Sequence, residues 1–156
     1  MNEQQIEKLR RGIDALVREF KIADAVPLRD GGPSLNPSDV QTLIYVGEHD
    51  GCIARDVAKV LGVPPTSVST IVDRLVRRNY MSRRRTEENR RVVVLSLTDD
   101  GRDVLGQILD EQRRHCAAML ATLTPKERDQ FVAQIATIAN GVNRSRSGDT
   151  YAENHN

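Results

Sequence analysis

Arginine is concentrated in one short segment of this chain. Residues 74–91 hold eight arginines and two glutamates, a local charge of +6, whereas the net charge of the whole chain is +1. The remaining residues therefore sum to −5. A basic patch on a nearly neutral protein indicates a defined anionic partner, and nucleic acid is the first candidate. Charge alone leaves a solvated, arginine-rich surface as an equal alternative.

The segment just before these arginines has the spacing of a helix-turn-helix. In residues 54–73, "ARDVAKVLGVPPTSVSTIVD", Ala58 lies four residues before Gly62, and Val68 and Ile71 follow at core positions. A small residue lets two helices approach, and a glycine makes the turn between them. Helices are predicted over about 53–61 and 65–78. An ordinary helical hairpin with a glycine turn is the alternative.

The second of these helices separates into two faces. Its apolar residues, Val68, Ile71, Val72 and Leu75, are predicted to point inward. Short hydroxyls fit a DNA groove, and arginines reach phosphates or guanine. No lysine or glutamate occurs between residues 64 and 78, unlike an ordinary solvated helix. The outer face, predicted to contact DNA, consists of Thr66, Ser67, Ser69, Thr70, Asp73, Arg74 and Arg77.

A basic hairpin follows the second helix. Residues 80–85 and 91–97 are predicted as two strands joined by a polar tip. A hairpin after a helix-turn-helix makes a winged helix, whose wing reaches the DNA backbone or a minor groove, where arginine is favoured. If about half of the arginines neutralise phosphates, the logarithmic salt slope of binding is about −4 per protomer. The predicted DNA contacts in the wing are Arg83, Arg85, Arg90 and Arg91.

Long amphipathic helices are predicted on both sides of this module. Residues 3–25 place apolar side chains at steps of three and four, which is one stripe of a helix. Residues 144–156 have almost no apolar content, which predicts a disordered tail. Further helix starts are indicated by Asn36 with Pro37 and Asp39, by Thr98 with Asp99 and Asp100, and by the capping box of residues 124–127.

Composition argues against several other classes of protein. The chain has no run of 18 apolar residues, so no membrane span is predicted. Its N-terminus lacks the continuous apolar region of a secretory signal, so Cys52 and Cys116 are expected to be reduced thiols in the cytoplasm. No Ser/His/Asp set, phosphate-binding glycine loop or paired carboxylates in an apolar setting occurs, so we expect neither an enzyme nor a cofactor.

Two stretches resemble the MarR family of transcriptional regulators. They are "LGVPPTSVSTIVDRLVRRNYMSRRR", residues 61–85, and "NRRVVVLSLTDDGRDVL", residues 89–105. The resemblance extends from the first helix to about residue 142 and implies a mainly α fold with a winged helix-turn-helix module. The chain departs from the family pattern at Asn79, where the family usually has glycine, and at Asn89 in the wing tip, where it usually has aspartate.

The resemblance implies a homodimer on a pseudo-palindromic double-stranded DNA operator. Residues 1–30 and 102–143 would form the helical dimerisation region, and residues 36–101 the DNA-binding module. Half-sites would lie about 10 bp apart. Such regulators are usually repressors that a small phenolic or other aromatic ligand, or an oxidant, releases. Arg91 resembles the arginine that enters the minor groove, with Arg90 beside it, and Asp73 resembles an aspartate that pairs with that arginine; an i,i+4 pair with Arg77 is the equal alternative.

The sequence says least about what such a regulator would sense. Phe20, Leu43 and His115 are candidate lining residues of a small-molecule site, although core packing explains each equally well. Cys52 and Cys116 are the redox candidates, and Cys52 is favoured because a helix N-terminus lowers a thiol pKa. No four-ligand metal set is evident, so no metal is expected. A winged-helix module for protein–protein contact, without an operator, is the alternative function.

Overall fold

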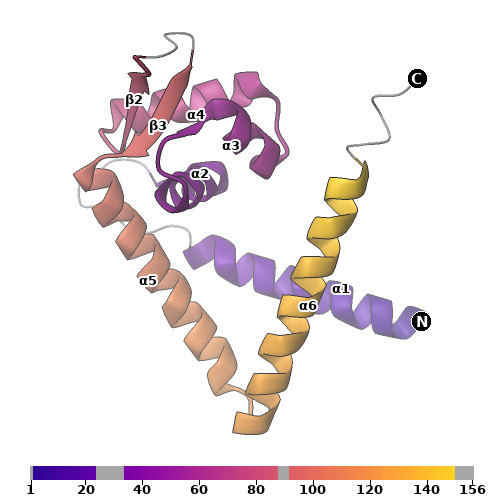
Figure 1. Ribbon diagram of the computed structural model, residues 1–156. Coiled ribbons are helices and arrows are strands. Elements are labelled where there is room, and N and C mark those ends of the chain that lie inside the picture. Colours follow the sequence, from indigo (N-terminus) through magenta and orange to yellow (C-terminus); the bar gives the residue numbers. More distant parts are fainter. Residues whose placement is uncertain (1, 24–33, 88–91, 150–156) are drawn as a thin grey trace. The chain divides into compact units, whose positions relative to one another are not determined.

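The computed structural model describes residues 2–23, 34–87 and 92–149 (Figure 1). Residues 1–115 and 116–156 form separate compact units. No helix in the described ranges is long and apolar enough to cross a membrane. The elements are α1 (Glu3–Ala23), α2 (Pro37–Glu48), β1 (Cys52–Ile53), α3 (Ala54–Leu61), α4 (Pro65–Arg77), β2 (Met81–Arg85), β3 (Val93–Leu97), α5 (Asp99–Ala121) and α6 (Pro125–Asp149).

Helix α2 begins at the predicted capping residues. The Asn36 side chain accepts a hydrogen bond from the Asp39 N–H at 2.9 Å, and the Asp39 carboxylate accepts one from the Asn36 N–H at 3.3 Å. Pro37 occupies the first turn, where its missing N–H costs nothing. The predicted helix start is confirmed, and α2 continues to Glu48 as expected.

Helices α3 and α4 form the predicted helix-turn-helix. Gly62 ends α3 with φ 66°, in the left-handed region that glycine adopts without strain. Ala58 is buried, and α3 and α4 pack against each other. The inward face of α4 is also confirmed, because Val68, Ile71, Val72 and Leu75 are all buried.

The hairpin is confirmed, and a third strand joins it. Strands β2 and β3 are antiparallel and lie beside α4 (Figure 1), with Arg83 opposite Leu95. The short strand β1 pairs with the other edge of β3, so the strand order is β1-β3-β2. The sequence did not predict β1, because two residues are too few for a periodic pattern. The sheet and α2–α4 share one core, which includes Leu43, Val46, Val57, Leu75, Met81 and Leu95.

Helix α5 starts immediately after β3 and packs closely on the end of α4. The Thr98 hydroxyl accepts a hydrogen bond from the Gly101 N–H at 3.0 Å, which confirms Thr98 as the N-cap. Gly101 is buried against the backbone of Tyr80, between α4 and β2. Residues 98–101 therefore attach α5 firmly to the module.

Helices α1 and α6 keep their apolar residues exposed. Ile6, Leu9 and Ile13 of α1 are 49–60% exposed, and Ile135 and Ile138 of α6 are 49% and 56% exposed. The structure corrects the predicted tail, because α6 continues to Asp149 rather than ending near residue 142. Extending an existing helix adds one hydrogen bond per residue without a new nucleus. Residues 150–156 lie outside the described ranges.

Candidate nucleic-acid interface

The hydroxyl residues of α4 lie on its exposed face. Thr66, Ser67, Ser69 and Thr70 are all exposed, as predicted. Ser69 donates its hydroxyl to the Pro65 carbonyl at 3.2 Å, and Thr70 donates to the Thr66 carbonyl at 3.4 Å. Their oxygens keep lone pairs for a donor from outside. The face can therefore enter a groove without bulky side chains in the way.

Arg74 has a partner that the sequence did not predict. Its guanidinium forms hydrogen bonds with both carboxylate oxygens of Asp39 at 2.5–3.1 Å, across 35 residues of sequence. The Asp39 side chain is 2% exposed and that of Arg74 is 34% exposed. The hydrogen bonds with Asp39 raise the pKa of Arg74 further above its usual range. Arg74 therefore joins α4 to the start of α2 and is only partly exposed, and its predicted DNA contact stays a prediction.

Asp73 connects α4 to the wing through an unexpected partner. Its carboxylate accepts a hydrogen bond from Arg83 of β2 at 2.7 Å, and both side chains are about half exposed. Arg77 forms no ion pair with Asp73 among the described residues, and Arg91 lies outside them, so its predicted pairing with Asp73 stays a prediction. Exposed ion pairs contribute little to stability, about 0–1 kcal/mol. The pair instead orients Arg83 beside the exposed face of α4.

The three consecutive arginines of β2 point to two faces of the sheet. Side chains alternate along a strand, so Arg83 and Arg85 share the face of buried Met81, while Arg84 lies on the other face. Within the described ranges, Arg77, Arg84 and Arg85 are exposed and form no ion pair with a carboxylate. Of the arginines predicted to contact DNA, Arg77 and Arg85 are therefore the described ones that are both exposed and not paired with a carboxylate.

Three arginines of residues 74–91 are still to be placed, and only one of them lies within the described residues. Arg78 stacks over the Tyr80 ring at 5.1 Å, a contact that the sequence did not predict. The signal that could have indicated this cation–π contact is an arginine two residues before a tyrosine. Arg90 and Arg91, together with Asn89, lie outside the described residues, so their predicted DNA contacts stay predictions.

The candidate ligand-lining residues do not form one site. Leu43 is fully buried in the core of the module, so it packs against protein and is not accessible to a ligand. His115 is half-buried on α5, where its Nδ1 lies 3.1 Å from the Glu111 carbonyl oxygen. The side chain of Phe20 lies outside the described structure. The prediction that Leu43 lines a ligand site is therefore wrong, and the alternative, packing in the core, is the one observed.

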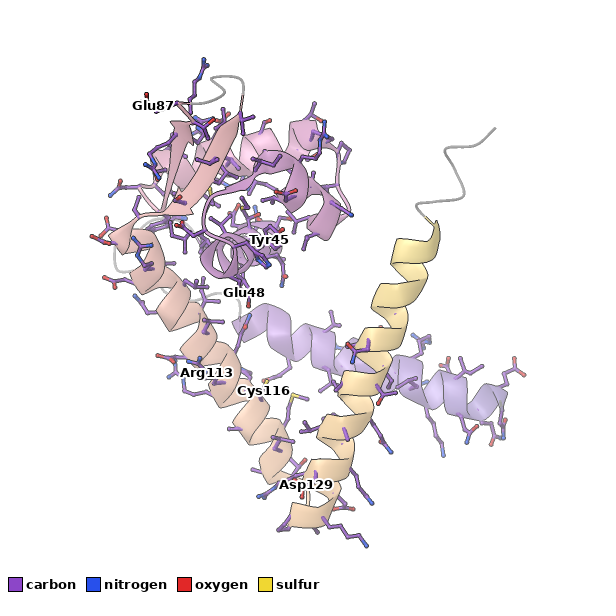
Figure 2. All side chains as sticks on the ribbon, viewed as in Figure 1. Tyr45, Glu48, Glu87, Arg113, Cys116 and Asp129 are labelled. Atoms are coloured by element: carbon purple, nitrogen blue, oxygen red, sulfur yellow. The ribbon has the colours of Figure 1, made fainter. Side chains whose placement is uncertain are left out.

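The two cysteines also differ from expectation. Burial, and then the negative charge of Asp56, raise the pKa of the Cys52 thiol, whereas a lowered value was predicted. Desolvation and carboxylates outweigh the helix N-terminus because both disfavour a thiolate. Cys116 is exposed on α5 (Figure 2). No cluster of three or more His, Cys, Asp or Glu side chains suited to a metal occurs among the described residues.

Cys52 should react slowly with iodoacetamide in the native protein. Because its pKa is raised, the native state holds less thiolate at neutral pH than the unfolded chain, and its rate should increase as pH rises beyond the usual range of a thiol. The measurement compares alkylation of Cys116→Ser protein in buffer and in urea. Equal rates in the two states would contradict the raised pKa.

The amino-acid sequence of this chain is similar to those of known proteins. Residues 34–92 match the MarR family. The HTH-type transcriptional regulator YwhA of Bacillus subtilis is 28% identical over 97 residues, which are 62% of this chain and 68% of YwhA. The HTH-type transcriptional repressor MdtR of the same organism is 29% identical over 105 residues, 67% of this chain and 68% of MdtR.

Solved structures share the fold. Streptococcus pneumoniae FabT, crystallised in complex with DNA, superposes with a TM-score of 0.78 at 19% identity, covering 89% of this chain and 98% of FabT. The crystal structure of MarR gives a TM-score of 0.75 at 20% identity, covering 90% of this chain and 94% of that one. The mainly α, winged helix-turn-helix architecture predicted from the sequence is confirmed by these likenesses.

Proposed function

Because the chain belongs to the MarR family of transcriptional regulators, we propose that it represses transcription by binding double-stranded DNA as a homodimer. The observation that carries the proposal is an exposed hydroxyl face on α4, together with arginines at its end and on the adjoining wing strand that form no ion pair among the described residues. A regulator of this kind acts on the chromosome, so we place it in the cytoplasm.

The proposed DNA contacts follow from the module. Helix α4 enters the major groove with Thr66, Ser67, Ser69 and Thr70 toward the bases, and Arg77 at its C-terminal end toward phosphates. Arg85, with Arg90 and Arg91 of the tip, reaches the adjacent backbone or minor groove. Asp73 is held by Arg83, which offsets the repulsion between its carboxylate and DNA.

The proposed dimer uses the helices on both sides of the module, within residues 1–30 and 102–143. Apolar stripes with Ile6, Leu9 and Ile13 on α1, and with Ile135 and Ile138 on α6, are exposed in the single chain. Monomeric proteins rarely expose continuous apolar surfaces of this kind. A second copy would cover them and bring two α4 helices to the half-sites of a pseudo-palindrome about 10 bp apart.

Alanine at Arg77 or Arg85 should weaken DNA binding and flatten its salt dependence. Removing one phosphate-neutralising arginine from each protomer should reduce the logarithmic salt slope by about 2, from about −8 for a dimer with four such arginines per protomer. Fluorescence anisotropy at several salt concentrations measures the slope. Arg113→Ala removes the same charge far along α5 (Figure 2) and should leave the slope unchanged.

The operator is found by selection from a randomised DNA duplex library. Enrichment of a pseudo-palindromic sequence by the wild-type protein is the expected result. If no sequence is enriched at low salt, the module is not an operator-binding one, and the winged helix would instead serve protein–protein contact. A small aromatic ligand that releases the operator is part of the proposal; a screen of aromatic acids against the protein–operator complex identifies it.

A further inference from the structure

The C-terminal end of α4 is closed by Asn79 in an uncommon conformation. Asn79 has φ 59°, and it is the one residue other than glycine with a positive φ in the described ranges. Its N–H donates to the Val76 carbonyl, and the Tyr80 N–H donates to the Leu75 carbonyl, both at 3.0 Å. These two bonds form a Schellman motif, in which glycine is the usual residue at this position.

The side chain of Asn79 makes an interaction that glycine cannot make. Its amide Nδ2 donates to the Asp100 carboxylate, in the first turn of α5, at 2.8 Å. Asparagine tolerates the left-handed region better than most residues but less well than glycine. The conformational cost of asparagine is thus offset by a bond between the end of α4 and the start of α5.

Two further bonds join the same two elements, and both use the backbone of residues 79–80. Thr98 donates its hydroxyl to the Asn79 carbonyl at 2.5 Å and its N–H to the Tyr80 carbonyl at 3.2 Å. Any residue at positions 79 and 80 supplies those carbonyls. Of the three bonds, only the Asn79–Asp100 bond depends on the side chain at position 79.

We propose that the Asn79–Asp100 hydrogen bond holds α4 at a set angle to α5, and that both residues are positioning residues for operator spacing. The inference rests on the proposed function, a dimer that binds two half-sites. The backbone bonds keep the ends of α4 and α5 together, and the side-chain bond restricts rotation between them. Since α5 leads along the chain into the proposed dimerisation region, that rotation governs the distance between two α4 helices.

The experiment uses the selected operator and four versions in which the half-site spacer is one or two base pairs longer or shorter. Wild-type protein should bind one spacing best. Asn79→Gly should remain folded, because glycine relieves the positive φ, yet its preference over the neighbouring spacings should fall about three- to tenfold, the factor for removing one exposed hydrogen bond of ordinary net strength. Thermal unfolding of each variant gives the fold control.

Variants at the other end of the bond separate position from charge. Asp100→Ala should weaken the spacing preference as Asn79→Gly does, and the double variant should weaken it no more than either single one. Asp100→Asn keeps an acceptor oxygen and should retain the wild-type preference. Asp99→Ala is the matched control, because it removes an acidic residue from the same helix turn without touching Asn79.

The outcomes distinguish this inference from the proposed function. If Asn79→Gly and Asp100→Ala bind the operator with wild-type spacing preference, the positioning role is overturned while operator binding stands. If wild-type protein selects no operator, the proposed function fails and this inference fails with it. A weakened preference in Asp99→Ala as well would assign the effect to helix-end charge and overturn the role of the bond.

Discussion

Replacing Gly101 with alanine should unfold the winged-helix module or destabilise it by about 4 kcal/mol or more, which is a large part of a small domain's stability. A Cβ at this position would lie 1.9 Å from the Tyr80 carbonyl oxygen and 2.8 Å from its carbonyl carbon. Both are backbone atoms, so no side-chain rotation relieves the clash. Relief requires α5 to move away from the end of α4.

The measurement is urea unfolding followed by circular dichroism. Gly106→Ala is the matched control in the same helix, because a Cβ there meets no atom within 4 Å. Alanine is the better helix former, so this control should be stabilised by about 0.5–1 kcal/mol. Wild-type stability of Gly101→Ala would show that α5 does not pack on Tyr80 in this way.

Arg74→Ala should lower the free energy of unfolding by about 2–4 kcal/mol. The substitution leaves the Asp39 carboxylate, 2% exposed, without its guanidinium partner, and breaking a buried pair costs about 3–5 kcal/mol. The expected loss for Arg74→Ala is set below the range for a buried pair because Arg74 itself is partly exposed. Because the raised pKa keeps the guanidinium charged up to and beyond the ordinary range of arginine, its contribution should not decline through neutral and mildly alkaline pH.

Arg77→Ala provides the comparison, since it makes the same chemical change one turn further along α4. Arg77 is exposed and forms no ion pair within the part of the chain that the structure describes, so its removal should alter stability by no more than about 0.5 kcal/mol while weakening DNA binding. The pair of variants thus separates an arginine that stabilises the module from one that serves the interface. Equal stability of the two proteins would contradict the role assigned to Arg74.

Much of the fold could be predicted because it depends on local rules. The Asn36 cap follows from a side chain reaching its own helix turn, and the two faces of α4 follow from helical periodicity. Thr98 and the hairpin strands are signalled in the same way. Strand β1 was missed because it forms through long-range pairing with β3, and two residues are too few to show a strand pattern in the sequence.

The candidate site was predicted less completely. The sequence by itself determined where the arginines are concentrated, which face of α4 is polar and that a wing follows it. Only the tertiary structure decided that Arg74 serves Asp39, that Arg83 serves Asp73 and that Leu43 is part of the core. Asp39 lies 35 residues before Arg74, so their pairing exists only once α2 packs against α4. Periodicity assigns a side chain to a face, but its partner depends on which elements that face meets.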